Sequence, residues 1–158
     1  MSLLSFFQWC EQSSIGDAIR NSVWLFPLIE AFHLVGLGVT AGAVLLVDLR
    51  LLGFGLGRQP VPQLAKDAEP WLMGSLALMF ASGIPLFLSE SIKCYYSFAF
   101  WLKMISLFLV LLFTFTVRRR VTRTVDTSAR PLVGKVVALV SLALWGGVGW
   151  GGRWIGFS

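Results

Sequence analysis

Residues 23–47 read VWLFPLIEAFHLVGLGVTAGAVLLV, a run in which Glu30 and His33 are the only titratable side chains. A helix needs about 20 predominantly apolar residues to cross a bilayer. Three further apolar stretches follow, at 71–89, 98–117 and 132–152. Bilayer strands alternate apolar and polar residues, and these stretches do not alternate. The sequence therefore predicts an all-α fold, an integral membrane four-helix bundle.

The composition of the 158-residue chain points the same way. Hydrophobic residues make up 56% and charged residues 13%, with a mean hydropathy of +0.78. A typical soluble domain is about 45–50% apolar and about 25% charged. These values exclude a soluble enzyme, a disordered tail and a coiled coil. We expect one membrane domain over residues 1–158, in which residues 1–22 form a short interfacial amphipathic segment on the lipid bilayer.

The basic residues are distributed unevenly between the two predicted sides of the membrane. Arg20, Lys93 and Arg153 fall on one side. The opposite side holds Arg50, Arg58, Lys66, Arg118, Arg119, Arg120, Arg123, Arg130 and Lys135. Cytoplasmic loops carry the excess of Lys and Arg. The pattern predicts a bacterial inner (cytoplasmic) membrane protein with a cytoplasmic loop at 118–130 and both termini periplasmic.

The net charge of +5 comes largely from an arginine cluster that directly follows the third span. Juxtamembrane basic runs of this kind lie against the negatively charged leaflet. We expect Arg118, Arg119, Arg120 and Arg123 to contact anionic lipid, and we expect no nucleic-acid partner.

Ionisable residues inside the spans predict a candidate ligand or cofactor site in the outward-facing half. Glu30 and His33 lie three residues apart, on one face of a helix, and Lys103 falls at a matched depth in the third span. Two interpretations stay open: a structural Glu30–Lys103 ion pair, or a site for a polar ligand, a cofactor or a proton. Asp48 shares the helix face of Glu30. Arg153 and Trp150, near the outer end of the last span, complete the candidate set.

The single histidine restricts the metal chemistry that one chain can support. Haem ligation by two histidines needs a second chain. Glu30-x-x-His33 is part of a di-iron motif that needs two such pairs and two further carboxylates. If a metal binds, His33 and Glu30 are the candidates, and haem or quinone stays open as a cofactor. Cys10 and Cys94 are predicted on the outer face, where they form either a disulfide or two buried apolar positions.

Five segments carry a family resemblance: IRNSVWLFPLIEAFHLVGLG (19–38), VDLRLLG (47–53), PWLMGSLALMFASGIPLF (70–87), Phe100 with Lys103, and SLALWGGVGWGGRWIGF (141–157). Together they resemble an uncharacterised family, a domain of unknown function, of small bacterial inner-membrane proteins. The resemblance implies four helices and a pattern that includes Glu30, His33, Asp48, Arg50, Lys103 and Arg153. More distantly, the chain is similar to copper-resistance and cytochrome b561-type bundles. The stretch LLFTFTVRRR (111–120) lacks the histidine that family members often carry there.

Three functions are compatible with this pattern. The first is a non-enzymatic accessory subunit or binding module with a polar site, working in a larger membrane complex or as a homo-oligomer. The second is a redox component that holds haem or quinone between its helices. The third is a small transporter or proton pathway along Glu30, His33, Thr40 and Asp48. No nucleophile is placed beside an acid and a base, which argues against an enzyme.

Overall fold

The computed structural model describes residues 2–55, 59–124 and 130–155, and it confirms the all-α fold. Four helices are long and apolar enough to cross a membrane. They are α3 (Leu25–Leu52), α4 (Val61–Ser89), the continuous span Phe98–Arg123, and α8 (Pro131–Ile155). The third span consists of α6 (Phe98–Phe113), a π-helical turn η1 (Thr114–Arg118) and α7 (Arg119–Thr124). Three short helices complete the described ranges: α1 (Leu3–Glu11), α2 (Ser14–Arg20) and α5 (Ser91–Tyr96).

The helices extend beyond the predicted spans. α4 begins at Val61 rather than near residue 71, because Pro62 stands in the first turn, where a missing N–H removes no helical hydrogen bond. α3 continues to Leu52 and stops at Gly53, whose φ of 94° is left-handed. The amides of Gly53 and Phe54 then bond back to carbonyls in the last turn of α3, at 3.1 and 2.9 Å. Arg58 and the part of the basic loop at 125–129 lie outside the described residues.

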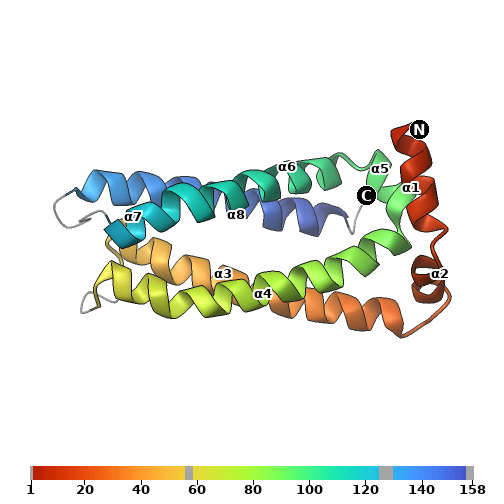
Figure 1. Cartoon of the computed structure of the whole chain (residues 1–158), viewed down its shortest axis with the longest axis horizontal. Helices are drawn as coiled ribbons and strands as arrows, with labels where there is room; N and C mark the ends of the chain where they lie inside the picture. Colours follow the sequence, from red (N-terminus) through yellow and green to blue (C-terminus); the bar gives the residue numbers. More distant parts are fainter. Residues whose placement is uncertain (1, 56–58, 125–129, 156–158) are drawn as a thin grey trace.

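The long helices pack as two antiparallel pairs (Figure 1). α3 packs against α4, α6 packs against α8, and contacts between α3 and α8 join the pairs. The backbones of α4 and α6 are not in close contact. The end of the bundle that carries α1, α2, α5 and both chain termini is called the cap end, and the opposite end is called the arginine end.

The amphipathic segment closes the cap end. The Glu11 carboxylate accepts the Ile92 amide at 2.5 Å, and Arg20 donates to the Ser89 carbonyl at 2.9 Å. Phe7 is buried among aromatic rings, with centroids 5.4 Å from Phe87 and 6.3 Å from Phe100. These contacts tie α1 and α2 to the end of α4 and to the start of α6. The segment is therefore a lid on the bundle as well as an amphipathic element.

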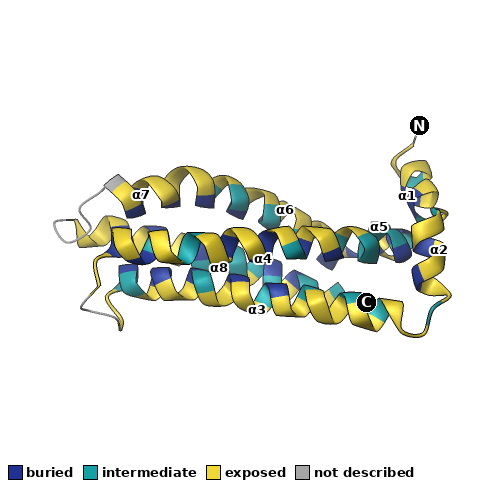
Figure 2. Cartoon of the chain, turned by 60° about the horizontal axis from the view of Figure 1, so that its bottom comes forward, coloured by how far each residue is buried: buried dark blue, intermediate teal, exposed yellow. Residues whose placement is uncertain are grey.

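The outer faces of the long helices are exposed and mostly apolar (Figure 2). Large exposed side chains of this kind occur on every span, for example Leu28, Phe80, Phe108 and Leu139. A soluble protein rarely exposes so continuous an apolar surface, whereas lipid chains match it. The chain is a multi-pass membrane protein.

Two glycine pairs behave differently in this packing. On α8, a Cβ at Gly151 would lie 3.0 Å from the Ala99 carbonyl oxygen, and a Cβ at Gly147 would lie 2.8 Å from the Ser106 hydroxyl. These glycines allow α6 and α8 to approach closely. On α3, a Cβ at Gly38 or Gly42 would meet nothing within 4 Å among the described residues. This glycine pair is not used in packing against any other residue that the structure describes.

This contrast predicts the outcome of adding side chains at the two positions. Gly151→Val should lower the thermal midpoint in detergent, because the new methyl groups force α6 away from α8 at a cost of about 1–3 kcal/mol. Gly42→Val is the matched control, since it makes the same change of residue in open space and should leave the midpoint nearly unchanged. Equal midpoints for the two variants would show that the α6–α8 contact is not close-packed.

Candidate functional site

Paired polar side chains cross the interface between α3 and α4. The Thr40 hydroxyl donates to the Ser75 hydroxyl at 2.8 Å, and both residues are buried. Seven residues away on each helix, the His33 Nδ1 lies 2.9 Å from the Ser82 hydroxyl. Because the Ser82 hydroxyl donates to the Leu78 carbonyl at 2.7 Å, it accepts the Nδ1–H of His33.

His33 also lines a cavity of about 300 Å³ on the cap-end side of this interface. Gly83 leaves room for the ring, since a Cβ at Gly83 would lie 3.2 Å from the His33 Cε1. The walls come from all four long helices and are almost entirely apolar. The lining residues are His33, Leu76, Met79, Phe80, Gly83, Ile84, Phe87, Phe100, Lys103, Met104, Leu107, Trp145 and Val148.

The cavity lies between α4 and α6, whose backbones are not in close contact. Three of its lining side chains are also exposed on the outside of the bundle: Phe80 and Ile84 on α4, and Met104 on α6. At the cap end, the rings of Phe87 and Phe100 stack at 5.6 Å with an interplanar angle of 16°, against Phe7 of the lid. The cavity is thus roofed at the cap end and bordered by lipid-facing side chains between α4 and α6.

Lys103 is the charged residue of the cavity wall. Its backbone lies against α8 at Gly151, and its ammonium lies beside Gly152, where a Cβ would be 3.6 Å from the Nζ. The charge on Lys103 acts on His33 and on the Cys94 thiol. Within the described part of the chain, Lys103 forms no ion pair or hydrogen bond.

The structure separates the other members of the predicted set from this cavity. Glu30 is exposed on α3 and forms no salt bridge with any described residue, so the Glu30–Lys103 pair is not formed. Arg153 is exposed in the last turn of α8. Trp150 is exposed and stacks on Trp154 at 5.4 Å. Trp145, earlier on α8, lines the cavity.

Asp48 lies at the arginine end and is fully buried. Arg118 of η1 donates its Nε–H to the Asp48 Oδ1 at 3.0 Å and its Nη2–H to the Val44 carbonyl at 3.4 Å. Arg118 is itself only 6% exposed. It is therefore part of the interior, and it does not belong to the surface that was expected to meet anionic lipid. The sequence pattern did not distinguish Arg118, the partner of Asp48, from the neighbouring arginines that are exposed.

Several buried oxygens around this ion pair lack a hydrogen bond within the described ranges. They are the second carboxylate oxygen of Asp48 and the hydroxyls of Thr114 and Ser141. Ser141 approaches the Asp48 carboxylate from α8, without the geometry of a hydrogen bond.

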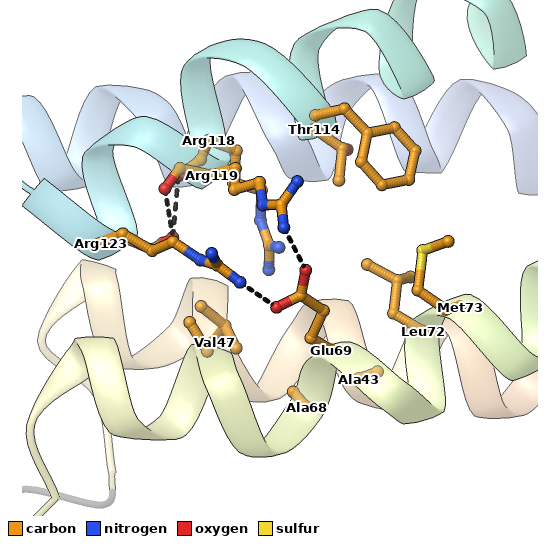
Figure 3. A pocket seen from close by; sticks show the side chains of 13 residues that line it. Ala43, Val47, Ala68, Glu69, Leu72, Met73, Thr114, Arg118, Arg119 and Arg123 are labelled. Carbon is orange, nitrogen blue, oxygen red and sulfur yellow. Dashed lines mark hydrogen bonds and ion pairs between the residues drawn. The ribbon is translucent and has the colours of Figure 1, made fainter.

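The remaining arginines of the cluster meet an acid on α4. Glu69 lies between Arg119, at 3.1 Å, and Arg123, in a shallow pocket of about 40 Å³ (Figure 3). Arg119, Arg120 and Arg123 are exposed. Contact of these three side chains with anionic lipid stays a prediction.

The donor set limits the cofactors that this chain can hold. No cluster of three or more His, Cys, Asp or Glu suitable for a metal ion is found among the described residues. His33 is the only histidine of the chain, and its Nδ1 is engaged by Ser82. A cofactor with a planar ring, unlike a metal ion, would contact the aromatic wall of the cavity and would have His33 and Lys103 as polar partners.

Cys10 and Cys94 are free thiols, and both are buried in the lid region. The disulfide considered from the sequence is not formed, and each thiol packs as a small apolar group. Burial raises the pKa of Cys10. Burial, followed by the negative charge of Glu90, raises the pKa of Cys94 to about 11.

The chain matches a known protein family. Residues 6–158 match the sequence model of a family of unknown function, DUF6644. The chain belongs to that family, in agreement with the resemblance seen in the sequence. Comparisons with curated proteins and with solved structures found no match.

The buried ion pair predicts an asymmetry between two charge deletions. Arg118→Met leaves Asp48 buried without a partner and should destabilise the protein by about 3–5 kcal/mol. Glu69→Gln, at a partly exposed pair, should cost about 1 kcal/mol or less. Adding Asp48→Asn to Arg118→Met should recover part of the loss in thermal unfolding. A double variant less stable than the single one would contradict the pairing.

The raised pKa of Cys94 predicts slow alkylation. Relative to a thiol of pKa 9.0, a pKa of about 11 lowers the thiolate fraction at pH 8 about 100-fold. The higher intrinsic nucleophilicity of such a thiolate offsets about tenfold of this. The rate of iodoacetamide labelling at Cys94, followed by peptide mass spectrometry, should keep rising up to about pH 11. A plateau near pH 9, as expected of unfolded protein in dodecyl sulfate, would contradict the burial.

Proposed function

We propose that this protein is a membrane-embedded binding module that takes a small, largely apolar molecule into the cavity between α4 and α6. The observation that carries the proposal is the cavity itself, about 300 Å³ in volume and walled by apolar side chains, with His33 and Lys103 as its polar groups. Ligand sites have this character: concave, mostly apolar, with a few polar groups that fix orientation.

The position of the cavity supports entry from the bilayer. Phe80, Ile84 and Met104 border the cavity and are exposed on the lipid-facing surface. The aromatic stack of Phe87 and Phe100 closes the cap end. A molecule dissolved in the membrane therefore reaches the cavity sideways, between α4 and α6.

Binding is favoured over catalysis by the hydrogen bonds of Ser82. A serine nucleophile needs its proton directed at a base. The Ser82 hydroxyl donates to the Leu78 carbonyl and accepts from His33, and no carboxylate of the described residues lines the cavity. A transport path along α3 has less support, because Thr40 and Val44 are tightly packed between His33 and Asp48.

A redox role with a bound quinone is the second candidate. The specific observation is the pair of stacked rings, Phe87 and Phe100, in a wall that also presents His33 and Lys103. A quinone ring would pack on the aromatic face, and its oxygens would accept hydrogen bonds from donors in the wall. An absorption spectrum of the purified protein, before and after reduction, tests this candidate.

We also propose that the protein is an accessory subunit that binds another membrane protein through the outer face of α3. Glu30 is exposed there, and Gly38 and Gly42 contact nothing else in the described chain. Small residues on a membrane helix permit close approach of another helix. We further propose a bacterial inner membrane and periplasmic termini, on the basis of the excess of Lys and Arg at the arginine end.

The proposal predicts that blocking the cavity mouth removes a bound molecule. Wild-type protein purified in a mild non-ionic detergent should retain an apolar molecule, detected by native mass spectrometry. Ile84→Trp fills the mouth and should reduce the retained fraction at least about tenfold, equivalent to about 1.4 kcal/mol. Ile105→Trp is the matched control, because Ile105 and Ile84 are equally exposed, at 57% and 58%, and Ile105 does not line the cavity. Equal retention by all three proteins would rule out this site.

A further inference from the structure

The charge of Lys103 has no counter-ion in the described part of the chain. The other acids there are accounted for. Four of them form salt bridges with arginines or with Lys93, namely Asp17, Asp48, Glu69 and Glu90. Glu11 accepts a hydrogen bond from Ile92, and Asp67 accepts one from Gln63. Glu30 is exposed on α3. The last turn of α8, beside the ammonium, contributes the partial negative charge of a helix C-terminus.

A cation within a membrane span is costly unless a partner neutralises it. His33 cannot act as the counter-ion, because an imidazole ring is either neutral or positively charged, and its Nδ1 is hydrogen-bonded to the Ser82 hydroxyl. The remaining lining residues are uncharged. The cavity wall therefore presents the positive charge of Lys103 beside a long apolar surface.

We propose that the cavity binds a single-chain amphiphile with a carboxylate head group. The carboxylate pairs with Lys103, and the hydrocarbon chain lies along Phe80, Ile84 and Met104 toward the lipid. A carboxylate carries one negative charge and balances one lysine, whereas a phosphate monoester carries about −1.5 to −2 at neutral pH. This inference rests on the proposed function and names its ligand class.

A head-group series on the wild-type protein tests the inference without any substitution. Delipidated protein in a non-ionic detergent is offered a sixteen-carbon carboxylate, the matching sixteen-carbon alcohol and a short-chain ubiquinone analogue, and bound molecules are counted by native mass spectrometry. The carboxylate should bind at least about tenfold more tightly than the alcohol, because the alcohol lacks the charge that pairs with Lys103.

Substitutions then assign the preference to one side chain. Lys103→Met should abolish the preference for carboxylate over alcohol, and Lys103→Arg should retain it. Lys135→Met is the matched control, since Lys135 is exposed on α8 and lies outside the cavity wall. If Lys103→Met fails to fold, the comparison of head groups on wild-type protein still decides the question.

The outcomes separate this inference from the function on which it rests. Equal binding of carboxylate and alcohol, or tighter binding of the quinone, overturns the carboxylate assignment and leaves the cavity as a binding site. Binding that is unaffected by Ile84→Trp, or no binding of any of the three probes, overturns the proposed function as well.

Discussion

The ion pair between Asp48 and Arg118 is the interaction on which this bundle depends. The hydrocarbon interior supplies no water, so a charged group there must find its partner inside the protein. The pair ties α3 to the third span at the arginine end, and the α1–α2 lid closes the cap end. Between these ends the backbones of α4 and α6 are not in close contact, and that separation makes room for the cavity.

The fold could be predicted from local properties of the sequence. Hydropathy and length fix the four spans, and neither depends on how the helices meet. The site depends on relative helix orientation, which residue counting does not determine. Depth in the membrane placed Glu30, His33 and Lys103 at one level, but only His33 and Lys103 line the cavity. Glu30 is on the same helix as His33, yet it is turned away from the cavity toward the outer surface.

Some of the missed partners left a signal in the sequence. Ser75, Ser82 and Ser89 recur at intervals of seven on α4 and are all buried, and Thr40 and His33 repeat with the same interval on α3. Matched heptad spacing of polar residues in two apolar spans indicates a shared antiparallel interface. Arg118 left no comparable signal, because it stands first in a run of three arginines with equal claims to the surface. Arg118 is the last residue of the π-helical turn, and its inward orientation depends on that turn.

The π-helical turn changes the direction of the Arg118 side chain without changing the hydropathy of the span. A π-helical turn is an α-helix with one extra residue, and each residue of an α-helix advances its side chain by about 100°. Removing one residue from Thr114–Arg118 would restore an uninterrupted α-helix and rotate the guanidinium away from Asp48. The hydropathy of the span would hardly change. Insertion into the bilayer thus depends on the composition of the span. Formation of the Asp48–Arg118 ion pair depends on the number of residues in the span.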